Sequence, residues 1–181
     1  AHAAPKSGQF FGAERSFLDM AAAIAKLPYN LHIVLPNRQR TYEKLLAPHC
    51  SKIHVTLYGW RHADMPENQS AVSSFRTILT EARAELVYVN TIMLREPFSA
   101  ARLEGIKSAV HCRELIDTDE QLCSVIGQSP EKIVADVVNG ADVTIANSRT
   151  TARLFNFGDR QKFVVPNVVA NELLDMPPRS A

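Results

Sequence analysis

Short apolar segments alternate with amphipathic segments along almost the whole chain. The apolar segments are rich in β-branched residues. Several are apolar at nearly every position, which is typical of strands covered on both faces of a parallel sheet. They predict about six strands, at residues 31–35, 53–58, 86–89, 108–112, 142–146 and 163–165.

Two of the intervening segments carry apolar residues at the three- and four-residue spacing with which a helix buries one face. Residues 14–26 place Phe17, Ala21 and Ile24 on one stripe, and residues 69–83 form a second stripe of this kind. Both segments are therefore predicted to be helices that pack against the sheet.

Boundary residues predict two further helices. Ser129 and Pro130 are favoured at the cap and at the first position of a helix, and Gly140 is a residue type that commonly ends one. Asn147-Ser148 is a second cap, for a helix that runs to about Phe155. Strands and helices that alternate in this way predict an α/β, Rossmann-like fold, with an open parallel sheet and helices on both faces.

Composition narrows the class of protein without indicating a function. A length of 181 residues fits one domain, and 46% hydrophobic with 22% charged residues excludes wholesale disorder. The net charge of +1 gives no reason to expect nucleic acid as a partner. Because Cys50, Cys112 and Cys123 are odd in number and widely spaced, we expect buried or half-buried free thiols and a reducing compartment.

Both ends of the sequence have features that are typical of a truncated chain. The chain begins at Ala1 rather than at Met, and the pair Pro177-Pro178 near its other end is typical of a stiff linker. We therefore expect a fragment of a larger protein. Residues 1–170 would form one Rossmann-like domain, and residues 171–181 would begin an interdomain linker.

Ligands of open parallel sheets bind outside the carboxyl ends of the strands, so the residues that follow each strand are the candidates for a site. The first such segment has Gly8 and Gly12 before an amphipathic helix. Glycine lets a ligand approach the backbone, and a helix N-terminus offers free N–H groups to a phosphate. The spacing matches neither a dinucleotide-binding loop nor a Walker loop, so a plain surface loop remains an alternative.

Two other strand ends carry polar residues that suit a polar ligand. Asn90 and Thr91 follow the third predicted strand, and Asn147 and Ser148 follow the fifth. Local backbone hydrogen bonds would account for the first pair without any ligand, and helix capping would account for the second.

Three ionisable side chains lie at the end of the fourth predicted strand. His111, Arg113 and Glu114 bring an imidazole, a guanidinium and a carboxylate within four residues. Alternation puts His111 and Arg113 on one side and Cys112 and Glu114 on the other, so a cationic pair could face a phosphate or sugar hydroxyls. The alternative is an Arg113–Glu114 ion pair beside a histidine whose hydrogen bonds are satisfied within the core.

Taken in order, these segments resemble the amino-terminal half of a retaining glycosyltransferase of the GT-B fold, in particular the bacterial group 1 or family 4 type. The resemblance covers about residues 7–175. The stretches that carry it are Gly12-Ala13-Glu14-Arg15, Val89-Asn90-Thr91, His111-Cys112-Arg113-Glu114-Leu115, Ala141-Asp142-Val143 through Ala146-Asn147-Ser148, and Val165-Pro166-Asn167-Val168-Val169.

The resemblance implies a two-domain GT-B architecture in which two Rossmann-like domains face each other across a cleft. This chain would be the amino-terminal half, which mainly binds the acceptor. A carboxy-terminal domain, absent from the sequence, would hold most of the nucleotide-sugar. The loop from Gly8 to Gly12 would approach the donor diphosphate, with Ala13 and Glu14 in the first helical turn beside it.

The resemblance also implies a histidine near the transferred sugar. The family usually has a histidine followed by an acid, whereas this chain reads His-Cys-Arg-Glu, so His111 and Arg113 both remain candidates for that place. We favour His111 as the catalytic group, with Arg113 and Glu114 supporting it. The remaining candidates for donor and acceptor binding are Asn90, Thr91, Asn147 and Ser148.

Sugar transfer requires negative charge to grow on a departing diphosphate, which helix N-termini and cations stabilise. GT-B enzymes generally do this without a bound metal. The acidic stretch Asp117-Thr118-Asp119 is interpreted as a solvated loop or a helix start. No metal or other cofactor is therefore expected, and the nucleotide-sugar would be a substrate.

The function implied is transfer of a sugar from a nucleotide-sugar to a sugar or lipid-linked acceptor with retention, in surface polysaccharide or glycolipid synthesis. We expect a cytoplasmic protein, with peripheral contact at the inner face of the membrane left open, and an isolated chain that transfers no sugar. The alternative is a non-catalytic α/β ligand-binding module. A nucleotide-sugar epimerase is disfavoured because the chain lacks the glycine fingerprint and a Tyr-x-x-x-Lys motif.

Overall fold

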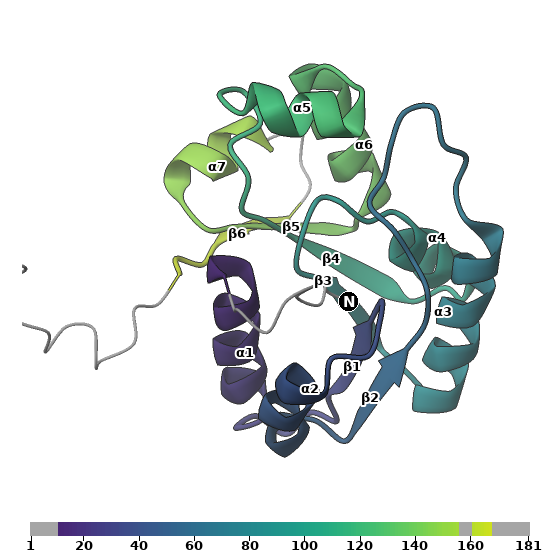
Figure 1. Cartoon of the computed structure of the whole chain (residues 1–181). Coiled ribbons are helices and arrows are strands. Elements are labelled where there is room, and N and C mark those ends of the chain that lie inside the picture. The colour runs from purple at the N-terminus through teal and green to yellow at the C-terminus, as the bar shows by residue number, and fades with distance from the viewer. Residues whose placement is uncertain (1–10, 156–160, 168–181) are drawn as a thin grey trace, which may run out of the picture.

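A computed structural model gives the structure of the chain and describes residues 11–155 and 161–167. Helices and strands alternate through these residues, as the sequence predicts (Figure 1). In chain order the elements are α1 (Gly12–Ile24), β1 (His32–Leu35), α2 (Arg40–Leu46), the 3₁₀ turn η1 (Ala47–His49), β2 (Lys52–Val55), α3 (Gln69–Ala82), β3 (Leu86–Val89), α4 (Glu96–Leu103), β4 (Lys107–Cys112), α5 (Glu120–Ile126), α6 (Pro130–Gly140), β5 (Val143–Ala146), α7 (Arg149–Leu154) and β6 (Lys162–Val164).

The described strands are all parallel, which confirms the predicted sheet type. They form two hydrogen-bonded sheets rather than the single sheet that the pattern predicts. One sheet contains β1 and β2, and the other has the order β3-β4-β5-β6. The hydrophobic pattern identifies a segment as a strand but does not specify its neighbour, so the break between the two sheets could not be read from it.

Helices cover both faces of the strands, and β1 shows why. Ile33 and Leu35 pack into a cluster with Phe17 of α1 and residues of α2. Val34, which lies between them, belongs instead to the larger cluster. Because alternate side chains of a strand point to opposite faces, β1 is buried on both sides, as predicted for a parallel strand.

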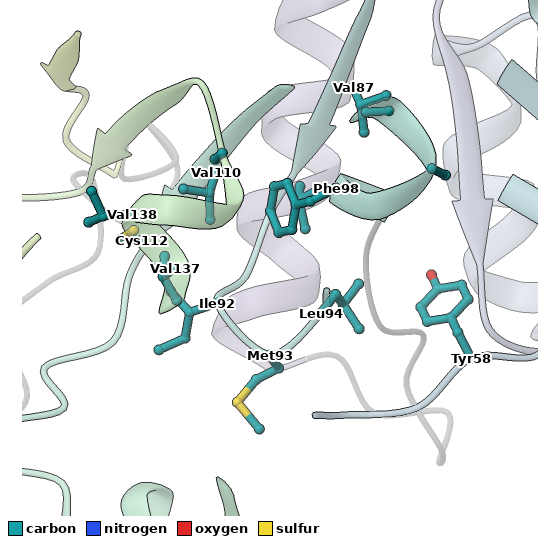
Figure 2. Close-up of a cluster of buried hydrophobic side chains, with 14 of the residues drawn as sticks. Tyr58, Val87, Ile92, Met93, Leu94, Phe98, Val110, Cys112, Val137 and Val138 are labelled. Atoms are coloured by element: carbon teal, nitrogen blue, oxygen red, sulfur yellow. The ribbon is translucent and has the colours of Figure 1, made fainter. Parts of the chain in front are cut away.

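The larger hydrophobic cluster lies against one face of β3 and β4 (Figure 2). Val87 and Val89 of β3 contribute to it, as do Val110 and Cys112 of β4, and α3, α4 and α6 supply most of the remaining side chains. The intervening residues of the two strands therefore point to the opposite face. They include Tyr88 and His111.

Several element boundaries differ from their sequence prediction. The second strand ends at Val55 rather than at residue 58, because its partner β1 ends opposite it at Leu35. The Tyr58 side chain is buried, and its hydroxyl donates to the Val34 carbonyl at 3.0 Å. The sequence analysis did not predict α2 or α4, and for α5 it gave only a helix start near residues 117–119 as one of two interpretations; these helices have seven, eight and seven residues. Helices of about two turns are too short to establish a clear apolar stripe.

The structure confirms the prediction of three free cysteines, with Cys112 buried and Cys50 and Cys123 half-buried. Among residues 11–155 and 161–167, no helix combines the length and apolar character that a membrane crossing demands. Gly8 and the expected linker at residues 171–181 lie outside the described residues.

Candidate active site

His111 lies near the carboxyl end of β4 and is only 4% exposed. The Tyr88 hydroxyl of β3 is 2.5 Å from His111 Nδ1, and the two rings meet edge to face at 89°. Burial, together with the nearby positive charge of Arg113, lowers the pKa of His111 to about 4. The imidazole is therefore neutral at pH 7 and cannot serve there as a cation.

The Arg113 guanidinium connects three parts of the fold. It donates hydrogen bonds to Ser16 Oγ of α1 and, at 2.9 Å, to Asn167 Oδ1 beyond β6. Its Nη2 also lies 3.4 Å from His111 Nδ1. Burial lowers the pKa of Arg113, but a guanidinium stays charged at neutral pH, so this group supplies a fixed positive charge beside His111.

The Glu114 carboxylate makes its hydrogen bonds away from that guanidinium. It accepts from the backbone N–H of Arg113 at 2.8 Å and from Thr91 Oγ1 at 3.0 Å. Burial raises the pKa of Glu114, and these hydrogen bonds oppose the rise. Within the described residues no salt bridge joins Arg113 to Glu114, so the interpretation of an ion pair between these two side chains does not hold.

Asn90 and Thr91 form the neighbouring strand end. Thr91 Oγ1 accepts from the backbone N–H of Met93 at 3.2 Å while it donates to Glu114, so it joins the ends of β3 and β4. Asn90 is 1% exposed. The hydroxyl of Thr91 thus serves its own backbone, as the alternative proposed, and also fixes the acid of the His-Cys-Arg-Glu stretch.

Asn147 and Ser148 follow β5 and play different parts. Ser148 Oγ accepts from the Thr151 N–H at 3.0 Å and caps α7, which confirms the capping interpretation. Asn147 Nδ2 instead donates to the Arg113 carbonyl at 3.4 Å, and the Asn147 backbone N–H donates to the Cys112 carbonyl at 3.2 Å. Asn147 therefore holds the backbone from which the Arg113 side chain extends.

The start of α1 carries Gly12, Ala13 and Glu14. Gly12 and Ala13 are exposed, and a Cβ atom placed on Gly12 would meet none of the described atoms within 4 Å. Glu14 is buried, and its carboxylate accepts from the Phe11 backbone N–H at 3.0 Å. Helix capping therefore accounts for Glu14, while the surface at Gly12 stays open to a ligand.

The structure brings α1 and the end of β4 together through the bond between Ser16 and Arg113. Ser16 lies one turn after Gly12, so the start of this helix and the His111 cluster share one edge of the fold, as the strand-end rule predicts. Glu14 and Ser148 form local capping bonds, whereas His111, Arg113 and Asn147 belong to one hydrogen-bonded cluster.

Sequence reasoning missed three members of this cluster: Ser16, Tyr88 and Asn167. Tyr88 is paired with Ala109, two positions before His111, so Tyr88 and His111 lie on the same face of the sheet. Alternation along each strand predicts which residues of that strand share a face. Only the pairing register of β3 against β4 shows that Tyr88 and His111 lie on the same face of the sheet. No comparable signal marks Ser16. Asn167 lies in the stretch at residues 165–169 that carries the family resemblance, but nothing in the sequence connects it to Arg113, because that contact bridges distant parts of the chain.

Two buried nitrogens of the cluster have no hydrogen-bond partner among the described residues. They are His111 Nε2 and Arg113 Nε. A buried polar atom without a partner is costly, so such an atom is commonly satisfied by water or by a ligand. Together with the Arg113 charge, these nitrogens could bind the oxygens of a sugar or a phosphate.

Acidic residues elsewhere do not form a metal site in the part of the chain that the structure describes. There, no group of three or more His, Cys, Asp or Glu side chains is placed to hold a metal ion. Within the acidic stretch at residues 117–119, Asp119 caps α5 by accepting from the Leu122 N–H at 2.9 Å. This confirms the interpretation of that stretch as a helix start.

The chain matches a known protein family over most of its length. The family described as the glycosyl transferase 4-like domain matches residues 11–167. The chain belongs to this family. The matched range contains α1, the His111 cluster and Asn167. It also confirms the part of the sequence interpretation that identified a domain of glycosyltransferase family 4 type.

Solved structures show the same fold at low sequence identity. One is the crystal structure of Anabaena Alr3699/HepE in complex with UDP-glucose, with a TM-score of 0.64 and 22% identity. A second crystal structure of that protein, in complex with UDP and glucose, gives 0.61 and 18%. In both cases the match covers 97% of this chain but only 46% of the other. No curated protein matches the chain.

Proposed function

We propose that this chain is the acceptor-side domain of a retaining glycosyltransferase, which moves a sugar from a nucleotide-sugar to an acceptor. Membership in the glycosyl transferase 4-like family supports the reaction class. The fold is shared with a protein that was crystallised with UDP-glucose, which supports a nucleotide-sugar as donor. The decisive observation is the unpartnered His111 Nε2, buried beside the charged Arg113 at the carboxyl edge of the sheet.

Each residue of the cluster has a chemical role in this proposal. Transfer develops an oxocarbenium-like sugar and negative charge on the departing diphosphate. The fixed positive charge of Arg113 and the open start of α1 at Gly12 stabilise that negative charge. His111 contacts the transferred sugar, while Glu114 and Asn147 hold the segment that carries Arg113. No step requires a metal ion or another cofactor.

A second domain completes the site in this proposal. The chain spans about half the length of the solved structures that it matches, which leaves room in such proteins for a further domain. That domain would hold most of the donor and close the cleft over the His111 cluster, excluding water. We therefore propose that the chain by itself transfers no sugar.

The acceptor and the setting are proposed from the family resemblance. The acceptor would be a sugar or a lipid-linked sugar, and the product a surface polysaccharide or glycolipid. Such synthesis would take place in the cytoplasm, with peripheral contact at the inner face of the membrane where the acceptor is lipid-linked.

The test is a transfer assay on the full-length protein that carries this chain. UDP-glucose and other nucleotide-sugars are supplied with and without candidate acceptors, and release of nucleoside diphosphate is measured. The anomeric configuration of the product is read by NMR. Acceptor-dependent release with a retained configuration is expected. Diphosphate release should be lost in Arg113→Ala. It should be kept in the control Arg102→Ala, which changes an exposed arginine on α4.

The competing function is a non-catalytic α/β ligand-binding module. Nucleotide-sugar binding without diphosphate release under any acceptor condition would favour that module and overturn the proposed reaction. Release with an inverted configuration would retain the glycosyltransferase and overturn only the retaining stereochemistry.

A further inference from the structure

The Tyr88 hydroxyl lies 2.5 Å from His111 Nδ1, and Arg113 Nη2 lies 3.4 Å from the same nitrogen. A guanidinium has only N–H donors and no acceptor atom. In the contact between Arg113 and His111, the ring nitrogen Nδ1 must therefore be the acceptor. A nitrogen that accepts in this way carries no proton to give to Tyr88, so in the 2.5 Å contact the Tyr88 hydroxyl is the donor.

The protonation of the phenol agrees with a bond that runs from Tyr88 to His111. Burial raises the pKa of Tyr88 to about 12, so the hydroxyl keeps its hydrogen at neutral pH. The bond therefore runs from the Tyr88 O–H to His111 Nδ1. Arg113 Nη2, at 3.4 Å, is a second donor directed at the same nitrogen. Because both neighbours donate, Nδ1 must be the ring nitrogen without a proton.

A neutral imidazole carries its single proton on one of its two nitrogens. With Nδ1 held as an acceptor, the proton resides on Nε2. That nitrogen is the buried atom of His111 that has no hydrogen-bond partner among the described residues. The unpartnered atom, His111 Nε2, is therefore an N–H donor without an acceptor. It is not an unprotonated nitrogen in need of a donor.

We propose that Tyr88 is a positioning residue that fixes His111 in its Nε2–H tautomer, so that His111 donates a hydrogen bond to an oxygen of the substrate. The role in sugar transfer rests on the proposed function, whereas the tautomer does not. The oxygen belongs to a sugar hydroxyl or to a phosphate, both of which accept hydrogen bonds. His111 is then no general base, because Nε2 already carries its proton and Nδ1 is occupied by Tyr88 and Arg113.

The tautomer is measurable in the chain without any substrate. Two-bond proton–nitrogen correlation spectra of the chain, labelled with ¹⁵N-histidine, distinguish the two neutral tautomers by their ring nitrogens. The chain has six histidines, and the His111 signals are assigned as those missing in His111→Gln. At pH 7 the wild type is expected to show only the Nε2–H pattern. A wild-type Nδ1–H pattern would overturn the proposal.

Tyr88→Phe removes the hydroxyl and keeps the ring. The Nδ1–H form of His111 is expected to become detectable in this variant, because only the longer contact from Arg113 remains. The matched control is Tyr58→Phe, which also loses a buried hydroxyl bond, to the Val34 carbonyl, but lies outside the His111 cluster. Unchanged His111 nitrogen shifts in Tyr88→Phe would contradict the positioning role.

Activity of the full-length protein gives a second readout. Loss of a group that orients a site histidine commonly costs 10-fold or more, so Tyr88→Phe is expected to lower kcat/KM at least about 10-fold. Tyr58→Phe should leave kcat/KM near the wild-type value at a similar change in Tm. Equal losses in the two variants would assign Tyr88 a merely structural role. A full-length protein without transferase activity would refute the proposed function, and the spectra would still decide the tautomer.

Discussion

Arg113 donates a hydrogen bond to Ser16, although the two residues are 97 positions apart in the chain. The bond ties the first helix to the segment that follows β4 (Figure 1). A second bond from Arg113 reaches Asn167, so one side chain gathers residues from the two ends of the matched family range. The guanidinium is therefore both a structural connection and the positive charge of the candidate site.

Arg113→Ala should raise the pKa of His111 from its value of about 4. The positive charge of Arg113 is the second cause of the low pKa, after burial, and the substitution removes that charge and uncovers part of the ring. An NMR titration of the His111 ring in both proteins measures the change. Arg102→Ala, in which the altered charge is exposed on α4, should leave this pKa unchanged. An unchanged or lower pKa of His111 in Arg113→Ala would contradict the prediction.

His111→Ala should reduce activity much more than folding stability. A preorganised polar contact that strengthens in the transition state contributes about 10²–10³ in rate, so kcat/KM of the full-length protein should fall by roughly that factor. Activity is normalised to folded protein by thermal melts. If His111→Ala keeps near-normal kcat/KM while Arg113→Ala is inactive, the family histidine's place belongs to Arg113 and not to His111.

The low pKa of His111 should also make stability depend on pH. An unfolded histidine takes up its proton near pH 6.5, whereas folded His111 does so only near pH 4. As the pH falls through this window the unfolded state binds more protons, so the free energy of unfolding should decrease with falling pH. The full contribution is about 3 kcal/mol, present above pH 6.5 and lost below pH 4.

Denaturant unfolding at pH 7, 5.5 and 4 measures this dependence, and His111→Gln is the control because it keeps a polar side chain that does not titrate. The difference in unfolding free energy between the two proteins should shrink as the pH falls. Burial lowers the pKa of His54 as well, and that contribution is common to both proteins. Parallel pH profiles would show that His111 titrates near its ordinary pKa.

Arg61→Ala should destabilise the fold by about 1–3 kcal/mol, because Asp136 and Gln128 lose their buried partner while Lys132 still pairs with Asp136. Arg61 is 8% exposed and its Nη2 lies 2.8 Å from Asp136 Oδ2 and 3.1 Å from Gln128 Oε1. Arg38→Ala is the matched control. Its ion pair with Glu43 is equally short, at 2.9 Å, but the Arg38 side chain is 74% exposed, so the loss should stay below about 1 kcal/mol. Equal melting shifts for the two variants would contradict this.

Much of the fold could be predicted because it is encoded locally. The strand at Leu86–Val89 agrees with its prediction. β4 begins one residue earlier than predicted, β5 begins one residue later, and β6 is displaced by one residue. The caps at Ser129 and Ser148 were also predicted correctly, since capping depends on residues three positions apart. The division of the described strands into two hydrogen-bonded sheets was not predicted, because strand pairing depends on contacts far apart in the sequence.

Part of the candidate site was predictable as a list of residues, but its hydrogen-bond network was not. His111, Arg113 and Glu114 are adjacent to a predicted strand end, so the strand-end rule selects them directly. Nothing local indicates that the Glu114 carboxylate would bond to Thr91 rather than to the Arg113 guanidinium. That choice depends on how the ends of β3 and β4 are paired.

The sequence by itself determined the class of fold, the carboxyl edge as the place of the candidate site and the chemical groups available there. Those properties follow from alternation and spacing along a strand or a helix, which neighbouring residues are sufficient to specify. Only the tertiary structure decided which nitrogen of His111 is available, because Tyr88 and Arg113 reach Nδ1 from different segments. The direction of a hydrogen bond depends on both partners, and here the register of β3 against β4 places those partners together.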